Sequence, residues 1–441
     1  MLVLLTGATG FLGKRIVQAL LLAGHEVIQV RRRASGTGNG QWEQTNPRQI
    51  EGDFSRDQQA SDWVERLRGV DVVVNAAGIL RESAGRTFAD VHVRGPCALF
   101  EACVLAGVRR VVQVSALGAD RAACSVYHLS KRAADDHLLT LPLSAVVVQP
   151  SLLFGPGGAS ASLFSMLAAL PVIPVPDRGQ QMIQPLHVDD AVRAIVALLR
   201  EDAPAGRVEL VGPTALSLKA FLLTLRQSLG LGVAKVLPVP AGLVDLAAWG
   251  ASWRRNAVLD SNTWHMLQRG NTGDPVATRV LLGEAPRAPA LFFSQAEAPM
   301  HRLQAQLAWL LPLLRWSLAT VWIATAVVSL WVYPVDQSLQ LLQRVGAPPA
   351  WGPFLLWSAA LLDLALGIAA LSLHRWRPLW SLQALLIVFY TVVITLRMPE
   401  FWAHPYGPLL KNLPMLGLLF LLHELTPRSV TQQPVPEQVT A

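Results

Sequence analysis

Three side chains in this sequence have the types and the spacing of a proton-transfer site. Ser115 ends an apolar run, and Tyr127 and Lys131 follow it. Tyr127 and Lys131 are four residues apart, so they share one face wherever the chain is helical. A tyrosine is a poor acid near neutral pH because its usual pKa is about 10, and a neighbouring ammonium group lowers that pKa. The spacing therefore predicts that Tyr127 acts as acid or base beside Lys131, while Ser115 orients a substrate oxygen.

A glycine-rich loop lies at the start of the chain, between the apolar run Leu2–Leu5 and a helical pattern. Gly7 would allow a tight turn, Gly10 would let the backbone approach a pyrophosphate, and Gly13 would permit close packing of helix on strand. The phosphates would then lie at the helix N-terminus. The residues expected to contact a dinucleotide in this loop are Gly7, Ala8, Thr9, Gly10, Phe11, Leu12 and Gly13. Tyr127 and Lys131 would contact the nicotinamide ribose of the same cofactor.

The end of the second predicted strand indicates which dinucleotide is preferred. Folds that prefer NAD carry an acidic residue there, which binds the adenine ribose hydroxyls. Here the run Glu26–Val30 continues into Arg31, Arg32 and Arg33, with no acid. Guanidinium groups suit a 2′-phosphate. We therefore expect NADP(H), with NAD(H) less favoured. The alternative is that these arginines form a solvated basic turn that does not bind the cofactor.

The elements that must position these residues alternate between strand and helix in the first part of the chain. Apolar runs of four to six residues are separated by helical patterns, and this alternation predicts a doubly wound, parallel α/β sheet of the Rossmann type. The expected strands are Leu2–Leu5, Glu26–Val30, Val70–Val74, Arg110–Ser115 and Ser144–Gln149, and the expected helices are Phe11–Ala23, Phe88–Ala106 and Ser125–Leu139. From about residue 151 the pattern loosens into a small substrate lobe.

Four motifs resemble those of the extended and atypical short-chain dehydrogenase/reductases, including the NAD-dependent epimerase/dehydratase group. They are TGATGFLG (6–13), NAAG (75–78), VSALGAD (114–120) and YHLSK (127–131). VSALGAD is similar to the branch that contains the nucleotide-binding accessory subunit of respiratory complex I. The resemblance covers about residues 1–230. It implies that Asp53 and Phe54 lie near the adenine and that Ala76, Ala77 and Gly78 line the middle of the cofactor.

Two positions depart from the pattern of this family. Many relatives have an Asn early in the helix after NAAG, where it helps to pass protons to the active-site lysine, and this chain has His92. A histidine could still relay a proton. Many relatives also have an Arg before the proline of the sixth strand, where this chain has Gln149.

The composition changes near residue 308, and the apolar runs beyond it reach membrane length. About 20 residues cross a bilayer as a helix. Trp316–Tyr333, Pro353–Leu373 and Leu379–Leu396 are expected to span, and Leu413–Leu422, extended back to Pro405, is expected to form a weaker fourth span. The preceding stretch, Gly283–Pro299, is rich in Pro and Ala and is interpreted as linker. The predicted domains are 1–230, a helical extension with linker at 231–308, an all-α transmembrane bundle at 309–425 and a polar tail at 426–441.

The segment 309–425 resembles the DoxX-like family of four-helix membrane domains, mainly through Pro399–Pro405 and Lys411–Pro414. Some members of that family are linked to quinone-coupled oxidation, so the resemblance implies a lipid- or quinone-related small-molecule partner. Asp363 lies in the middle of a predicted span. A charge there should face the bundle interior and pair, and Lys411 and Asn412 are the candidate partners.

Composition and charge agree with a membrane protein of a reducing compartment. Charged residues make up 15% of the chain, against about 25% in a typical soluble protein. The net charge of +7 is attributed to membrane flanks and a phosphate-binding loop rather than to a nucleic-acid surface. The three cysteines are expected to be buried thiols, and no His, Cys or acidic cluster has the spacing of a metal site. The placement of the basic residues predicts an integral protein of the cytoplasmic membrane with its nucleotide-binding domain in the cytoplasm.

Three functions remain open at this point. The first is a membrane-anchored, NADP(H)-dependent oxidoreductase that acts on a carbonyl or alcohol of a lipophilic substrate. The second is a non-catalytic, nucleotide-binding scaffold or assembly subunit of a membrane redox complex. The third is a nucleotide-sugar epimerase or dehydratase. The presence of Ser115, Tyr127 and Lys131 together favours the first.

Overall fold

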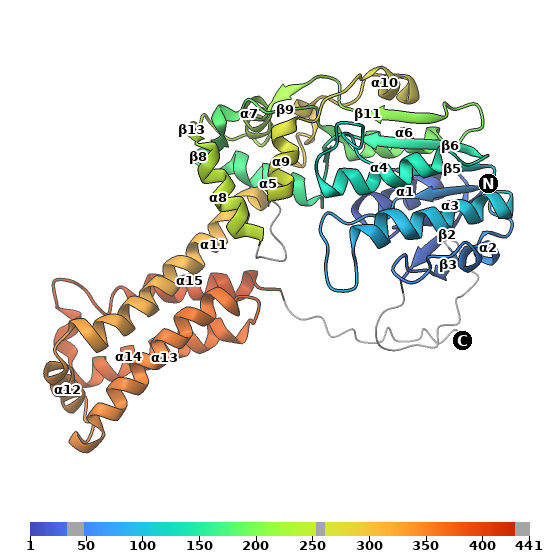
Figure 1. Ribbon diagram of the computed structural model, residues 1–441. Coiled ribbons are helices and arrows are strands. Elements are labelled where there is room, and N and C mark those ends of the chain that lie inside the picture. The colour runs from blue at the N-terminus through green and yellow to red at the C-terminus, as the bar shows by residue number, and fades with distance from the viewer. Residues whose placement is uncertain (33–47, 253–260, 428–441) are drawn as a thin grey trace, which may run out of the picture. The chain divides into compact units, whose positions relative to one another are not determined.

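The N-terminal unit is built on a parallel sheet (Figure 1). The computed structural model describes residues 1–32, 48–252 and 261–427. In this part of the chain, the seven strands of the main sheet lie in the order β11-β6-β5-β4-β1-β2-β3, and all neighbouring pairs are parallel. The strands are β1 (Leu2–Thr6), β2 (Glu26–Arg31), β3 (Arg48–Glu51), β4 (Val72–Asn75), β5 (Arg110–Val114), β6 (Ser144–Pro150) and β11 (Gly206–Leu210). The predicted doubly wound α/β fold is confirmed.

Helices cover both faces of this sheet. Side chains alternate between the two faces along each strand. Leu5 of β1 packs in one apolar core with Ile16 of α1 (Phe11–Leu22) and Ile195 of α6 (Val188–Ala197). Its neighbour Leu4 packs in the second core, with Leu99 of α3 (Gly95–Ala106) and Leu138 of α4 (Val126–Leu138). Helix α4, which carries Tyr127 and Lys131, therefore belongs to the second face.

Shorter elements form the lobe beyond the main sheet, drawn in green and yellow in Figure 1. Among the described residues, three two-stranded pairs occur there: β7 with β10, β9 with β12, and β8 with β13. The further elements of this unit are α2 (Ser61–Val64), β7 (Leu153–Phe154), α5 (Ala159–Ala169), β8 (Val172–Pro176), β9 (Met182–Ile183), β10 (Leu186–His187), β12 (Leu216–Ser217), α7 (Leu218–Ser228), β13 (Lys235–Val239), α8 (Ala241–Ser252), α9 (Ser261–Arg269) and α10 (Val276–Leu282).

The stretch interpreted as linker packs against the N-terminal unit. Phe292 is only 4% exposed, and its ring stacks on Phe154 at 4.9 Å between centroids. The backbone N–H of Arg287 donates to the Asp190 carboxylate at 2.7 Å. The interpretation of Gly283–Pro299 as linker was therefore wrong for this part of the chain. Composition suggested a linker because Pro and Ala are frequent, whereas the buried aromatic side chains decide the packing.

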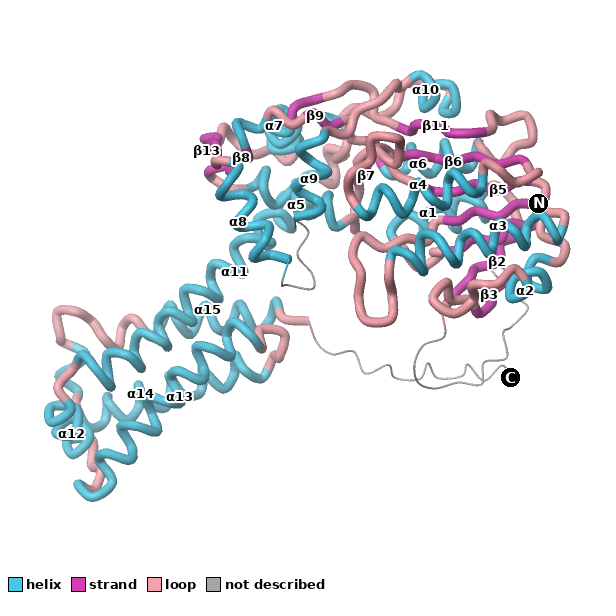
Figure 2. Tube along the Cα trace, in the orientation of Figure 1, coloured by secondary structure: helices cyan, strands magenta, loops and turns pink. Residues whose placement is uncertain are grey.

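The second compact unit begins at Leu307 and consists of helices (Figure 2). Its elements are α11 (Ala298–Val327, which starts in the first unit), α12 (Val335–Arg344), α13 (Gly352–Ser372), α14 (Pro378–Arg397) and α15 (Asn412–Leu425). Three segments of the described chain are long and apolar enough to cross a membrane, namely Ala298–Val332, Pro349–Ser372 and Pro378–Arg397. The three strongest predicted spans are thus confirmed as long apolar helices, while α15 has only 14 residues.

Inside this helical unit, Asp363 is buried, as expected, with 6% of its surface exposed. The predicted pairing with Asn412 is wrong, because the Asn412 amide donates to the Thr391 hydroxyl at 2.7 Å. Lys411 lies at the start of α15 and is exposed.

Candidate active site

The cap of helix α4 places Tyr127 and Lys131 at the carboxyl edge of the sheet. Ser125 stands just before the helix, and its hydroxyl accepts a hydrogen bond from the His128 N–H at 3.2 Å. Such a cap satisfies an otherwise unpaired donor and fixes where the helix begins. Tyr127 and Lys131 consequently lie on one face of α4, as the four-residue spacing predicts, and Asp135 continues that face one turn further.

Lys131 is held beneath the loops that follow β4 and β5. Its ammonium group donates to the Val114 carbonyl at 3.1 Å and to the Ala77 carbonyl at 3.3 Å. Only 4% of its surface is exposed. A Cβ atom on Gly78 would lie 3.1 Å from the same ammonium nitrogen. Lys131 thus reaches the segment Ala76–Gly78, which resemblance assigns to the middle of the cofactor.

Burial shifts the pKa of the lysine downward. The pKa of Lys131 falls to about 8 because burial disfavours the ammonium form, and the Asp135 carboxylate opposes the shift. The group therefore changes charge within reach of physiological pH.

Tyr127 lies in an aromatic surrounding and keeps part of its surface exposed. Its ring makes edge contacts with Phe88, His92 and His128, at centroid distances of 6.1, 5.5 and 5.4 Å. Burial, and after it the negative Asp135, raise its pKa to about 12. The expectation that Lys131 lowers the pKa of Tyr127 was wrong for this structure. The physical reason is that loss of hydration outweighs the attraction of one neighbouring ammonium group.

Ser115 forms a buried pair with Asp135. The serine hydroxyl donates to the aspartate, and the two residues are 4% and 0% exposed. Burial raises the pKa of Asp135 to about 6, against the lowering effects of Ser115, Lys131 and Gln113. The role predicted for Ser115, orienting a substrate oxygen, does not fit this placement, because the hydroxyl is engaged with a carboxylate below the surface.

A buried polar chain continues from this pair across the sheet. The Thr6 hydroxyl donates to the Asn75 side chain, and the Asn75 amide donates to Gln113 at 2.7 Å. All three residues are at most 2% exposed. Asp135 lies next to Gln113, so the chain joins the glycine loop after β1 to the face of α4. Asp135, Gln113 and Thr6 were not predicted as site residues from the sequence.

His92 lies in a π-helical segment, Ala89–Arg94, that precedes α3. Its Nε2 accepts the backbone N–H of Ile79 at 3.0 Å, so the ring proton resides on Nδ1, which donates to the Ser130 hydroxyl at 2.9 Å. The Ser130 hydroxyl in turn donates to the Tyr127 carbonyl at 2.8 Å. Burial, with Lys131 second, lowers the pKa of His92 to about 2. A proton relay through His92 does not fit, because the ring stays neutral and both nitrogens are engaged.

The glycine loop has the geometry that a dinucleotide needs. Gly7 has a φ of +69°, and a Cβ there would meet the Ala76 carbonyl. A Cβ on Gly13 would fall on the Gly7 carbonyl, so this glycine permits the close approach of α1. Helix α1 begins after Gly10 without a side-chain cap and without an acid in its first turn, and Thr9 and Gly10 are exposed. The N–H groups in the first turn of a helix have no intrahelical partners, so the start of α1 fits a phosphate.

The basic residues after β2 are placed differently from one another. The Arg31 guanidinium donates to the Gln29 side chain at 3.0 and 3.2 Å, whereas Arg32 is exposed and Arg33 lies outside the described residues. Arg86, in the loop after β4, is close enough for the positive Arg32 to lower its pKa, after burial, while Asp53 opposes the shift. Its Nε is buried without a hydrogen-bond partner among the described residues. Arg86 was missed because a loop arginine carries no sequence signal.

Asp53 and Phe54 follow β3 at the same edge of the sheet. The Asp53 carboxylate accepts the Ser55 N–H at 3.0 Å and remains partly exposed. Phe54 is 6% exposed and packs between Gly95 and Trp63. Asp53 can therefore contact an adenine, whereas most of the Phe54 ring belongs to the core.

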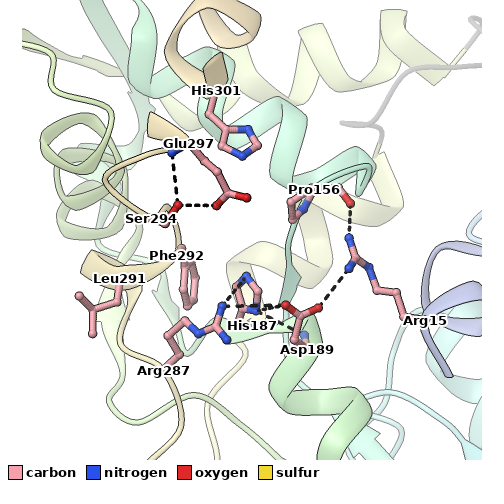
Figure 3. Close-up of a pocket in the computed structure, with 10 residues that line it drawn as sticks. All are labelled: Arg15, Pro156, His187, Asp189, Arg287, Leu291, Phe292, Ser294, Glu297 and His301. Atoms are coloured by element: carbon pink, nitrogen blue, oxygen red, sulfur yellow. Dashed lines mark hydrogen bonds and ion pairs between the residues drawn. The ribbon is translucent and has the colours of Figure 1, made fainter. Parts of the chain in front are cut away.

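A separate cavity of about 460 Å³ lies on the other face of the sheet (Figure 3). Arg15 of α1 pairs with Asp189 of α6 at 3.1 Å, and Arg287 faces the same carboxylate at 3.9 Å. His301 and Glu297 lie on the opposite wall. None of the predicted catalytic or cofactor residues lines it, and its arginines are already paired with acids.

The two parts of the chain match two family models. Residues 3–212 match the NAD dependent epimerase/dehydratase family, and residues 319–420 match the DoxX-like family. The fold of the first part is shared with a nucleoside-diphosphate-sugar epimerase from Staphylococcus aureus, at a TM-score of 0.54 and 18% identity over 66% of this chain and 99% of that one.

Curated relatives align with about half of this chain. A ceramide reductase of Caulobacter vibrioides is 33% identical over 210 residues, which are 47% of this chain and 63% of that protein. The mitochondrial NADH dehydrogenase (ubiquinone) 1 alpha subcomplex subunit 9 of Arabidopsis thaliana is 30% identical over 221 residues, 47% of this chain and 52% of that one. The chain thus spans less than two thirds of the length of these relatives. With the glycine loop, the Tyr127–Lys131 pair and the apolar helices in place, the chain joins an N-terminal domain of the NAD dependent epimerase/dehydratase family to a C-terminal DoxX-like domain.

Proposed function

We propose that this protein is a membrane-anchored, NADP(H)-dependent reductase that converts a ketone of a lipophilic substrate, of the ceramide type, into an alcohol. The observation that carries the proposal is the placement of Lys131 against Ala77 and Gly78, with Tyr127 one turn away and partly exposed. This is where a substrate carbonyl would meet the cofactor expected on the glycine loop.

The roles of the side chains follow from their charges. When bound, the reduced dinucleotide supplies the hydride that adds to the carbonyl carbon. Tyr127 donates its phenolic proton to the substrate oxygen, on which negative charge develops. The Lys131 ammonium stabilises the phenolate left behind, and the phenolate then recovers a proton from solvent.

The pKa of Tyr127 suits the role of proton donor in the proposed reduction. A phenol with a pKa of about 12 is protonated at neutral pH, so it is ready to donate a proton and poor at accepting one. A base for alcohol oxidation would need a pKa closer to the working pH. The phenol is thus in the protonated form that the proposed reduction needs.

The substrate class rests on two supports. One relative, similar over 47% of this chain, is a ceramide reductase. In addition, helix α11 connects the nucleotide-binding unit to apolar helices of membrane length. Because the unit is anchored in this way, a substrate dissolved in the bilayer would be accessible to it. We place the reductase unit on the cytoplasmic side of the cytoplasmic membrane, where basic residues flanking the spans are retained.

The preference for NADP(H) rests on Arg32 and Arg86. Both approach the carboxyl end of β2, where the adenine ribose lies in this fold, and the Arg86 Nε has no hydrogen-bond partner in the described part of the chain. By calorimetric titration, NADPH should bind more tightly than NADH, and Arg32→Ala and Arg86→Ala should each weaken NADPH alone. Arg31→Ala is the matched control with a smaller effect, because that guanidinium is engaged with Gln29. Equal or tighter binding of NADH to the unaltered protein would overturn the preference.

The test of the reaction uses the full chain in lipid nanodiscs, with NADPH and a long-chain keto-ceramide or, separately, a nucleotide sugar. The keto-ceramide should be reduced. Tyr127→Phe should lower turnover by about 10²–10⁴-fold and leave NADPH binding nearly unchanged, because it removes the proton donor and little packing. Conversion of the nucleotide sugar alone, or full activity of Tyr127→Phe, would reject the proposal.

A scaffold role in a membrane redox complex is the second candidate. It is favoured by the similarity to a subunit of mitochondrial NADH dehydrogenase and by the inward placement of Ser115. Complete rescue of a deletion strain by Tyr127→Phe would select this function over catalysis.

A further inference from the structure

Helix α8 presents an apolar face to its surroundings. Its inner face is buried through Val244 and Ala248, which are 7% and 0% exposed and pack against Trp264. On the outer face, Leu243, Leu246 and Trp249 are 58%, 62% and 57% exposed. With 3.6 residues per turn, these three side chains and Ala247 form one continuous outer surface. The helix is therefore apolar on both sides.

The one charged side chain between Ala241 and Gly250 stands at the rim of this surface. Asp245 accepts a hydrogen bond from the Trp264 indole N–H at 2.6 Å. Its carboxylate is therefore engaged with α9, on the inner side of the helix. A helix on the surface of a soluble domain normally turns charged and polar residues outward. An exposed cluster of large apolar side chains instead indicates a surface that contacts something else.

The connection of this unit to the membrane indicates that the outer face of α8 contacts lipid. Helix α8 and the first residues of α11 belong to the same compact unit, which ends at Gln306. Helix α11 then continues without a break through Val327, as the first segment long and apolar enough to cross a bilayer. A single helix thus tethers the unit to a bilayer. Because of this tether, the effective concentration of lipid at the surface of the unit is high.

We propose that α8 is an interfacial helix whose outer face, Leu243, Leu246 and Trp249, inserts into the boundary between lipid headgroups and acyl chains. Leucines supply the apolar contact, and a tryptophan near the ends of inserted segments prefers this depth. The proposal does not depend on the reaction proposed above, since it concerns where the unit contacts lipid. It would bring the lobe beyond the main sheet to the surface from which a lipophilic molecule arrives.

The test measures the surroundings of a single nitroxide label on the full chain in nanodiscs of mixed phosphatidylcholine and phosphatidylglycerol. The label is attached at Leu246→Cys, in a chain whose exposed Cys124 and partly exposed Cys97 are replaced by serine. The matched control is Leu105→Cys on α3, where the native side chain is 69% exposed. Collision rates are measured with oxygen, which concentrates in the bilayer, and with a water-soluble nickel chelate.

The label at 246 should collide several-fold more with oxygen relative to nickel than the label at 105. Equal nickel access at the two positions would overturn the proposal, because the face would then be in water. Protection from both reagents at 246 would overturn it as well, in favour of contact with protein, either a second copy or the helical unit. Leu243→Cys serves as the second site if Leu246→Cys does not fold.

Discussion

The hydroxyl of Ser115 donates its hydrogen bond to Asp135, one helical turn beyond Lys131 on α4. This relationship assigns the serine to the support of a buried carboxylate. It also brings a negative group beside the lysine and tyrosine that carry the proposed chemistry, since Asp135 opposes the fall in the pKa of Lys131 and adds to the rise in the pKa of Tyr127.

Ser115→Ala should therefore act mainly on stability. It leaves one Asp135 oxygen without its donor, which should cost about 1–3 kcal/mol of unfolding free energy. Turnover should fall less than tenfold, in contrast to Tyr127→Phe. Asp135→Asn should make the serine substitution less costly, because a neutral amide needs the donor less, and a double-mutant cycle measures this coupling. If Ser115→Ala lowers turnover as much as Tyr127→Phe does, the serine has the role of orienting the substrate oxygen after all.

The rate of carbonyl reduction should depend on pH through Lys131. Its pKa in the folded protein is about 8, so the ammonium group is present below that pH and lost above it. Turnover measured from about pH 6 to about pH 10 should be level at first and then fall as the pH rises past about 8. Asp135→Asn removes the carboxylate that raises the pKa of Lys131, so the fall should begin at a lower pH. An unchanged profile in Asp135→Asn would show that the carboxylate does not act on Lys131.

His92 should prove to be a positioning residue rather than a proton relay. His92→Ala leaves the Ile79 N–H and the Ser130 hydroxyl without this partner in a buried place, which should lower the unfolding free energy by about 1–3 kcal/mol. The alkaline fall in turnover should stay where it is, because His92 is neutral throughout that range. If the pH at which turnover falls changes in His92→Ala or in His92→Asn, a proton relay through His92 is supported instead.

Contacts within the helical unit bear on the number of membrane crossings. Arg377, just before α14, donates to the His423 carbonyl at 2.9 Å, and Trp380 donates to Thr426 at 3.0 Å. The end of α15 therefore lies beside the turn between α13 and α14. We expect a fourth crossing, even though 14 helical residues span only about 21 Å.

Reporters that are active only in the cytoplasm test this topology. From Arg375 and Arg377 we expect the turn on the cytoplasmic side, and from Arg302 and Arg315 we expect the start of the first span there as well. Reporters inserted after residue 376 and fused after residue 430 should both be active. Activity at 376 with silence after 430 would leave three crossings.

The sequence by itself determined the order of strands and helices, the glycine loop, the pairing of Tyr127 with Lys131 on one face, and the long apolar helices. Each of these is local: it depends on spacing along the chain, on the period of apolar residues, or on the length of an apolar run. The contact of Arg31 with Gln29 and the packing of the stretch Gly283–Pro299 are of another kind. The local composition there is basic or rich in Pro and Ala, but the Gln29 side chain and the buried Phe292 decide where these residues lie.

Only the tertiary structure decided how the site is charged. Ser115 contacts Asp135, Lys131 contacts carbonyls at the end of β5 and in the loop after β4, and His92 contacts Ile79. Each contact joins segments that only the folded sheet brings together. Burial is the largest cause of the pKa shifts of Tyr127, Lys131, Asp135 and His92. The spacing of residues says which groups can be neighbours, whereas loss of hydration depends on everything packed around them, and it outweighed the attraction of Lys131 that spacing alone predicted for Tyr127.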